Sequence, residues 1–347
     1  MSDVKIGVAG HFMLKVETYD GQSAKTRNYY KMLCKKYGSD SINMLDTHFF
    51  KKKFIRNILK CVYMGLTDDA IIIMPTKWIL SALANMFLIF KKIRGIKVIY
   101  VVVGGWLSEY VAEHRQLVNK LNQLDKILVE TESLKKELEL LGLTNVVLSP
   151  NFSTREHISK EKAISTRVQK PYKLFTFSRV TKSKGITEAI IATEILNARG
   201  VACTLDVFGM LDEEFREEFE TEAKRAEACV TYKGVLKDNI IETLNLYHLM
   251  LFPTYYPGEC FPGAVLEAMM AGVPVIASDW RHNKDIVKED FNGYLYDLDS
   301  TTDLIDKTQS LLAKPEKLQS LRVNCWHESQ RYSPESVMCI LYSILDN

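Results

Sequence analysis

The sequence predicts an α/β protein with two doubly wound domains, each a parallel sheet covered by helices on both faces. Short apolar segments alternate with segments of helical periodicity along the whole chain, which is the pattern of such sheets. A chain of 347 residues with 47% hydrophobic content is long enough to form two domains. A polar, charged stretch at 153–170 separates two series of segments, so we expect domains at 1–155 and 156–332.

Six apolar segments of strand length are expected in the first domain: Lys5–Ala9, Ser41–Asp46, Ala70–Met74, Lys97–Val103, Lys126–Glu130 and Val146–Leu148. Helical patterns lie between them, at Ser23–Tyr37, Phe49–Gly65, Ile79–Arg94, Glu109–Leu121 and Ser133–Leu141. The second domain is expected to contain Lys173–Phe177, Thr204–Phe208, Val230–Lys233, Leu249–Pro253, Val275–Ala277 and Gly293–Tyr296. A last helix, about 333–347, is expected to pack back on the first domain. Ligands of such sheets bind outside the carboxyl ends of the strands.

Charge and cysteine content exclude several functional classes. The net charge is only +2 and no long block of one sign occurs, which argues against a nucleic-acid partner. The seven cysteines are scattered and include no C-x-x-C pair, so we expect reduced thiols and neither a disulfide framework nor a zinc site. The first residues lack the pattern of a signal peptide, and no apolar run reaches the roughly 18 residues of a membrane span. We therefore expect a cytoplasmic protein.

The most informative segment runs from Gly258 to Ala277 and places two acids eight positions apart. Pro262 fits the first turn of a helix, and Gly272 is a stop signal, so Glu259 is expected on a loop and Glu267 on the helix. A helix N-terminus attracts an anion, and carboxylates on either side of it can accept hydrogen bonds from hydroxyl groups. This layout suits a nucleoside diphosphate sugar. The alternative is an amphipathic helix with two solvated acids.

The same segment closely resembles the E-x₇-E motif of the retaining glycosyltransferases of family 4, including the trailing Gly-Val-Pro-Val run. Cys260, Pro262 and Gly263 stand where members of the family often have Gly, Gly and Leu. The resemblance implies a GT-B fold, in which two Rossmann-like domains face each other across a cleft. It also implies that Glu259 lies beside the donor sugar ring and that Glu267 binds the ribose hydroxyls. The implied donor-binding set is Glu267, Cys260, Phe261, Gly263, Val235, Gly10 and His11.

Two basic residues, Arg179 and Lys184, follow the expected strand Lys173–Phe177. A chance cluster of cations on a solvated loop is the alternative to a functional role. Family 4 enzymes carry an Arg and a Lys on this loop that contact the donor diphosphate, which implies that role here. Two cations can stabilise the growing charge of the leaving diphosphate, so we expect no divalent metal and no cofactor. Arg179, Lys184 and Glu259 are thus the expected catalytic residues.

Two loops of the first domain are candidates for the other side of the site. Gly10 and His11 follow the first strand, and their loop either approaches the ligand or is a surface turn. Gly104, Gly105 and Trp106 follow the fourth strand, where many family members have a His that points at the donor sugar. The glycine amides are candidates to replace that contact. Trp106 either stacks on a sugar ring or belongs to the core.

The segment 49–60 combines five basic residues with aromatic and aliphatic residues and contains no acid. It is either an ordinary helix that covers the sheet or a helix that docks on anionic lipid at the inner face of a membrane. Docking would suit a lipid-linked acceptor.

The resemblance implies a retaining enzyme that transfers a hexosyl or N-acetylhexosaminyl group from a nucleoside diphosphate sugar to a hydroxyl of a surface polysaccharide or glycolipid. One alternative is a sugar-nucleotide epimerase of the same fold. Another is a partner subunit that resembles a glycosyltransferase but lacks catalysis.

Overall fold

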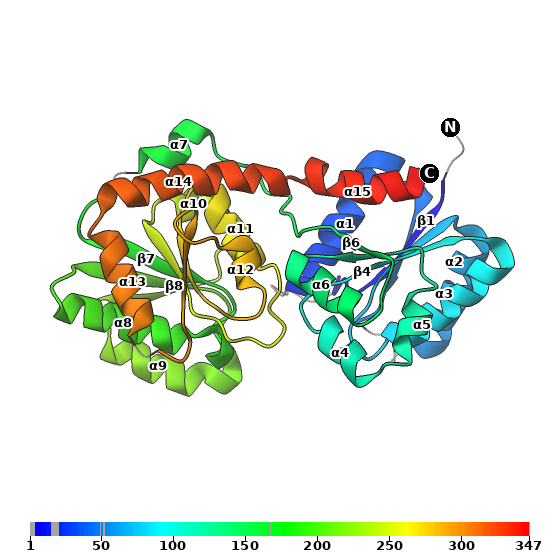
Figure 1. Ribbon diagram of the computed structural model, residues 1–347, viewed down its shortest axis with the longest axis horizontal. Coiled ribbons are helices and arrows are strands. Elements are labelled where there is room, and N and C mark those ends of the chain that lie inside the picture. Colours follow the sequence, from blue (N-terminus) through cyan, green and yellow to red (C-terminus); the bar gives the residue numbers. More distant parts are fainter. Residues whose placement is uncertain are drawn as a thin grey trace. The chain divides into compact units, whose positions relative to one another are not determined.

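The computed structural model describes residues 4–14, 21–48, 50, 53–166, 168–300 and 302–346 of the chain. The chain divides into two compact units (Figure 1). Unit 1 comprises Met1–Phe152 together with Pro334–Asn347, and unit 2 comprises Ser153–Ser333. These divisions lie close to the boundaries expected after residues 155 and 332.

Unit 1 contains a six-stranded parallel sheet in the order β2-β1-β3-β4-β5-β6. Its strands are β1 (Ile6–Gly10), β2 (Ile42–Asp46), β3 (Ala70–Met74), β4 (Lys97–Val101), β5 (Lys126–Val129) and β6 (Val146–Leu148). Its α-helices are α1 (Gly21–Tyr37), α2 (Phe54–Thr67), α3 (Leu80–Arg94), α4 (Leu107–Glu113), α5 (Leu117–Leu121), α6 (Glu132–Leu140) and α15 (Pro334–Asp346). All six predicted strands are confirmed, with small differences at their ends.

Two of the predicted helices of unit 1 differ from the observed ones. The helix expected from residue 49 begins at Phe54, and Phe49, Lys51 and Lys52 lie outside the described residues. The single helix expected over 109–121 was wrong, because α4 ends at Glu113 and α5 begins at Leu117. The backbone of His114 leaves the helical region, with φ −127° and ψ 63°, and its ring packs against that of Tyr110 at a centroid distance of 4.4 Å.

Helices α1 and α15 share a core with alternate residues of the strands in unit 1, although they lie at opposite ends of the sequence (Figure 1). Val337, Met338 and Leu341 of α15 are buried in this core with Tyr29 and Leu33 of α1. Helices α2 and α3 cover the other face of the sheet, where a Cβ atom at Gly7 would come within 2.6 Å of the Met64 side chain on α2. The sheet is thus covered on both faces, as predicted.

Unit 2 contains a second six-stranded parallel sheet, in the order β12-β11-β10-β7-β8-β9. Its strands are β7 (Tyr172–Phe177), β8 (Cys203–Phe208), β9 (Val230–Gly234), β10 (Leu249–Phe252), β11 (Val275–Ser278) and β12 (Gly293–Tyr296). Its α-helices are α7 (Lys160–Ser165), α8 (Ile186–Ala198), α9 (Arg216–Arg225), α10 (Ile240–Asn245), α11 (Gly263–Met270), α12 (Asn283–Ile286), α13 (Asp303–Leu312) and α14 (Pro315–Ser329). The six predicted strands of this unit are also confirmed.

The centre of the second sheet determines which loops meet. Strand β10 pairs with β7 on one side and with β11 on the other, and every residue of β10 and β11 is buried. Because all three strands are parallel, the loops that follow them leave the same edge of the sheet side by side. These are the loops that carry Arg179 and Lys184, Glu259, and Trp280.

The seven cysteines are all free thiols, as predicted. Among the described residues, no helix combines the length and apolar character that crossing a membrane would require.

Candidate functional site

The turn after β7 is pressed against the end of β10 at a position that only glycine can occupy. Gly185 has a φ of +69°, and a Cβ atom there would come within 1.9 Å of the carbonyl oxygen of Pro253. The Ser183 carbonyl accepts a hydrogen bond from the Tyr255 amide at 2.8 Å. Lys184 lies between Ser183 and Gly185 in the sequence, so both contacts fix it beside the loop that follows β10.

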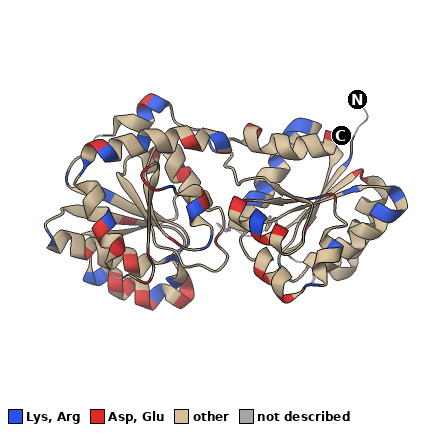
Figure 2. Cartoon of the chain, in the orientation of Figure 1, with Lys and Arg blue, Asp and Glu red and all other residues tan. Residues whose placement is uncertain are grey.

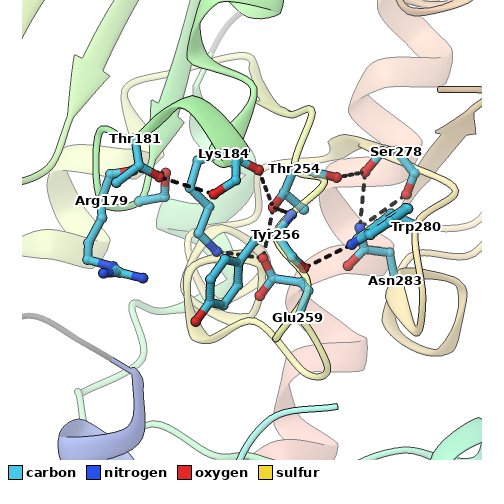
Figure 3. Close-up of polar contacts among 11 residues, drawn as sticks. Arg179, Thr181, Lys184, Thr254, Tyr256, Glu259, Ser278, Trp280 and Asn283 are labelled. Atoms are coloured by element: carbon cyan, nitrogen blue, oxygen red, sulfur yellow. Dashed lines mark hydrogen bonds and ion pairs between the residues drawn. The ribbon is translucent and has the colours of Figure 1, made fainter. Parts of the chain in front are cut away.

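Lys184 and Glu259 form an ion pair at the carboxyl edge of the sheet (Figure 3). The distance from Lys184 Nζ to Glu259 Oε2 is 2.6 Å, and the two side chains are only 11% and 8% exposed. Thr254 Oγ1 donates to the same carboxylate oxygen at 3.0 Å. Within the described part of the chain both donors go to Oε2, so Glu259 Oε1 is available to accept a hydrogen bond from a ligand.

The ring of Tyr256 lies beside both predicted diphosphate-binding cations, Arg179 and Lys184 (Figure 3). Lys184 Nζ is 4.6 Å from the ring centroid, and the guanidinium carbon of Arg179 is 5.6 Å from it. No carboxylate or hydrogen-bond acceptor of the described residues engages the Arg179 guanidinium. Cation–π attraction thus brings two positive groups to one place and leaves the Arg179 donors available for an anion.

A network of hydrogen bonds holds the Tyr256 loop in place. The Trp280 indole N–H donates to the Tyr256 carbonyl at 2.8 Å, and the Tyr256 amide donates to Thr254 Oγ1 at 3.2 Å. Ser278 Oγ donates to the Thr254 carbonyl, and Asn283 Nδ2 donates to the Ser278 carbonyl at 3.1 Å. None of these residues is among the sequence-based candidates. Their place at or after the carboxyl ends of β10 and β11 is the signal that could have identified them.

Glu267 lies on α11, as predicted, and its carboxylate has partners of its own. Arg155 Nε donates to Glu267 Oε1 at 2.7 Å, and Ser153 Oγ donates to the same oxygen at 3.4 Å. Burial raises the pKa of the Glu267 carboxyl above its ordinary value, and Arg155 and Ser153 oppose that rise. The two acids of the E-x₇-E segment therefore belong to separate clusters, one with Lys184 and one with Arg155.

The residues between the two acids start the helix and fill the core. Pro262 is the N-cap of α11, one position before the predicted first turn, and Gly263 is the first helical residue. Cys260 and Phe261 are buried, and the Phe261 ring packs edge-to-face on Tyr332 at 5.0 Å. The side chains of Cys260 and Phe261 therefore contribute to packing, and only their backbone groups are suited to contact a ligand. Val235 directly follows β9 and is half-buried.

The candidate residues of unit 1 lie at the carboxyl edge of its own sheet. Gly10 ends β1, and the half-buried ring of His11 meets the His48 ring at 5.0 Å. Trp106 is half-buried, and its indole N–H donates to the Val103 carbonyl at 2.9 Å. The polar end of Trp106 is therefore held by its own loop.

A buried ion pair stabilises the loop that contains Gly104. Lys25 Nζ donates to Glu130 Oε1 at 2.7 Å and to the Val102 carbonyl at 3.0 Å. The Gly104 amide donates to the other carboxylate oxygen, Glu130 Oε2, at 3.3 Å. The backbone amide of Gly104 thus has a protein partner.

Known proteins that are similar to this chain in sequence are glycosyltransferases. Residues 157–325 match the family model described as "Glycosyl transferases group 1". The chain is 24% identical over 263 residues to the GtfA subunit of a UDP-N-acetylglucosamine–peptide N-acetylglucosaminyltransferase of Streptococcus gordonii, covering 73% of this chain and 50% of that protein. It is 25% identical over 226 residues to the amylovoran biosynthesis glycosyltransferase AmsK of Erwinia amylovora, covering 62% of this chain and 54% of that protein. The chain thus spans about half the length of these curated relatives.

The fold is shared over the full chain with a solved structure, Anabaena HepE in complex with UDP-glucose. The TM-score is 0.73 at 16% identity, and the alignment covers 99% of both chains. This likeness and the two six-stranded parallel sheets confirm the predicted GT-B fold class. The matched residues 157–325 lie within unit 2, which holds Arg179, Lys184, Glu259 and Glu267. The match to this family model therefore falls on unit 2, and the similarity supports a glycosyltransferase.

Proposed function

We propose that the chain is a retaining glycosyltransferase of family 4 that transfers a sugar from a nucleoside diphosphate donor to a hydroxyl acceptor. The observation that carries this proposal is the pairing of Lys184 with Glu259 beside Arg179 in the matched domain. It combines cations for a diphosphate with a carboxylate oxygen for a sugar hydroxyl. HepE, which shares the fold, binds UDP-glucose.

Arg179 and Lys184 would stabilise the leaving group. When the bond between the anomeric carbon and the diphosphate oxygen breaks, its electron pair remains on that oxygen and increases the negative charge of the diphosphate. The free Arg179 guanidinium can form a forked contact with phosphate oxygens. The Lys184 ammonium has three N–H donors, so it can contact Glu259 and a phosphate oxygen at the same time. Each such charged hydrogen bond contributes on the order of 1.5–3 kcal/mol.

The two glutamates would have separate tasks. Glu259, held by Lys184 and Thr254, would accept a hydrogen bond from a hydroxyl of the donor sugar through Oε1 and orient the ring that reacts. Glu267, beside Arg155, would accept hydrogen bonds from the ribose hydroxyls. The acceptor oxygen would attack the anomeric carbon from the side on which the diphosphate leaves, giving retention. Its proton would pass to the leaving phosphate oxygen.

We propose that the reaction needs no divalent metal, because Arg179, Lys184 and the N-terminus of α11 can neutralise the diphosphate. The sequence contains one Asp-x-Asp triplet after β12, Asp297-Leu298-Asp299. There Asp297 Oδ1 accepts the Asp299 amide at 3.0 Å within a turn, and the Asp297 amide donates to Asp303 Oδ2 at 2.8 Å. These carboxylates stabilise the local turn. Activity that is lost with chelator and restored by magnesium or manganese would contradict the proposal that the reaction needs no divalent metal.

The acceptor that we propose is a growing surface polysaccharide or a glycolipid at the cytoplasmic face of a membrane. AmsK, one of the relatives, acts in amylovoran biosynthesis. The GtfA subunit belongs to a peptide N-acetylglucosaminyltransferase, so a peptide hydroxyl is the alternative acceptor.

A nucleotide-sugar panel tests the proposal. The matching donor should raise the unfolding temperature, because a ligand at 100 times its dissociation constant stabilises a protein by about 2.7 kcal/mol. That donor should then be hydrolysed slowly without acceptor, and proton NMR of the first product should show the anomeric configuration of the donor. A sugar epimer that stays linked to the nucleotide would identify an epimerase. Binding without any turnover would identify a non-catalytic partner subunit.

A further inference from the structure

Helices α2 and α3 of unit 1 expose large apolar side chains on the side that faces away from the sheet. Five on α2 are more than half exposed, and two on α3 are similarly exposed: Phe54 58%, Ile55 75%, Leu59 64%, Tyr63 52%, Leu66 55%, Ile89 56% and Ile93 71%. The opposite faces are buried, with Cys61 and Met64 on α2 and Leu83 and Phe87 on α3 fully enclosed. The exposed residues are therefore additional to a core that is already packed. We call the exposed faces of α2 and α3, which carry these side chains, the α2–α3 surface.

The two helices form one continuous surface because they touch. A Cβ atom at Gly65 of α2 would come within 2.3 Å of the Phe90 ring of α3, so glycine is required for this contact. Figure 1 shows α2 and α3 side by side on the same part of unit 1. Ile55, Leu59, Tyr63 and Leu66 of α2 recur at intervals of about one helical turn, as expected for one stripe along the helix, and Phe54 lies next to its first member. Exposed apolar surface of this extent is typical of an interaction site.

The charge of the α2–α3 surface has one sign. Neither helix contains an Asp or Glu, and in Figure 2 both are tan and blue without red. Four cations of this region have no ion pair with any described residue: Lys53, Arg56, Lys60 and Lys92. Two others are engaged, since Lys91 pairs with Asp125 at 2.6 Å and Arg94 donates to the Gly65 carbonyl at 2.9 Å.

We propose that the α2–α3 surface docks on an anionic lipid bilayer, with both helices lying in the plane of the membrane. This inference rests on the proposed function, in which a glycolipid is one of the acceptors. Aliphatic side chains would enter the boundary between headgroups and acyl chains, while the free lysines and arginine contact anionic headgroups. A protein partner fits less well, because lysine is depleted in protein interfaces. Lysine at a membrane keeps its charge in the headgroup layer while its stem lies along apolar surface.

Vesicle flotation tests the docking with the full chain. Wild-type protein should float with vesicles of phosphatidylcholine and phosphatidylglycerol, float poorly with phosphatidylcholine alone, and detach as salt is added. The variant Ile55→Ser/Leu59→Ser/Ile93→Ser should lower the partition coefficient by at least about 100-fold. The variant Lys53→Gln/Arg56→Gln/Lys60→Gln should lower it about fivefold for each charge removed. All substituted side chains are exposed or half-buried, so both variants should keep the circular dichroism spectrum of the wild type.

The matched control is Leu140→Ser, because Leu140 lies on α6 of the same unit and is 87% exposed but has no place on the α2–α3 surface. It should float like the wild type. A wild type that stays unbound at low salt, or an apolar triple variant that floats unchanged, would overturn the docking. So would a wild type that forms dimers through this surface and ignores vesicles. Donor hydrolysis, measured in the same samples without vesicles, reports on the proposed function separately.

Discussion

Each unit has a lysine–glutamate pair at the carboxyl edge of its sheet, and the two pairs differ in access. Lys25 and Glu130 of unit 1 lie 2.7 Å apart and are 1% and 3% exposed. Lys184 and Glu259 of unit 2 lie 2.6 Å apart and are 11% and 8% exposed. In unit 1 both carboxylate oxygens accept from protein donors, whereas in unit 2 Oε1 of Glu259 accepts from none of the described residues. We infer that the first pair stabilises the fold and that the second can engage a ligand.

The largest effect on stability should come from breaking the Lys25–Glu130 pair of unit 1. Lys25→Met would leave the Glu130 charge buried without its main partner, so the free energy of unfolding should fall by about 3–5 kcal/mol. Urea unfolding followed by circular dichroism measures this loss. The double variant Lys25→Met/Glu130→Leu should recover most of the stability, because it removes both charges. A single variant with wild-type stability would show that Glu130 is satisfied without Lys25.

Substitutions of the cations in unit 2, Arg179 and Lys184, should lower turnover more than stability. Arg179→Ala should lower turnover on the order of 10²–10³-fold, because this cation meets a charge that is largest in the transition state. The free energy of unfolding should stay near the wild-type value, because no described carboxylate depends on Arg179. Lys184→Ala should lower turnover similarly and cost some stability through Glu259.

Single-turnover kinetics and equilibrium binding of the free nucleoside separate these contributions. The nucleoside has no diphosphate, so its affinity should change little in both variants. Near wild-type turnover in both would remove Arg179 and Lys184 from the mechanism.

The two pairs also show how far the sequence could predict the site. Local periodicity predicts the strands, and Ala70–Met74, Val146–Leu148 and Gly293–Tyr296 have the observed bounds. The pairing of Lys184 with Glu259 depends instead on the sheet order, in which β10 lies beside β7 although three helices and two strands separate them along the chain. Arg155, the partner of Glu267, lies in the stretch interpreted as a linker. Contacts of this kind come from tertiary structure, which local patterns do not encode.

Glu267 provides a smaller effect on a different property. Glu267→Gln should weaken nucleotide binding by about tenfold, since a charged hydrogen bond to a ribose hydroxyl is replaced by a neutral one. Glu259→Gln should affect turnover more than nucleotide affinity, because Glu259 is assigned to the sugar ring. Calorimetric titration with the free nucleotide compares the two variants. Equal losses of nucleotide affinity would contradict the separate tasks.

The pKa of Glu267 adds a dependence on pH. Burial raises this pKa in the folded state, so between the ordinary value near 4.5 and the folded value the native state binds more protons than the unfolded state. The stability of the wild type relative to Glu267→Gln should therefore fall as pH rises through that window. Thermal unfolding of both proteins from pH 4 to pH 8 measures the difference. A difference that grows in favour of the wild type with rising pH would show that Arg155 outweighs burial.

The smallest effect on turnover should come from substitution of Tyr256. Its ring contacts both Arg179 and Lys184 but carries no charge itself. Tyr256→Leu removes the ring that lies 4.6 Å from Lys184 Nζ and 5.6 Å from the Arg179 guanidinium. Cation–π contacts contribute about 0.5–2 kcal/mol, so turnover should fall several-fold as the two cations lose their common position. Tyr256→Phe keeps the ring and should retain most of the turnover, which distinguishes a positioning role from a role of the hydroxyl. Steady-state kinetics with the donor that the nucleotide-sugar panel selects compare the variants. If Tyr256→Phe loses as much turnover as Tyr256→Leu, the hydroxyl takes part in the site and the ring contact is secondary.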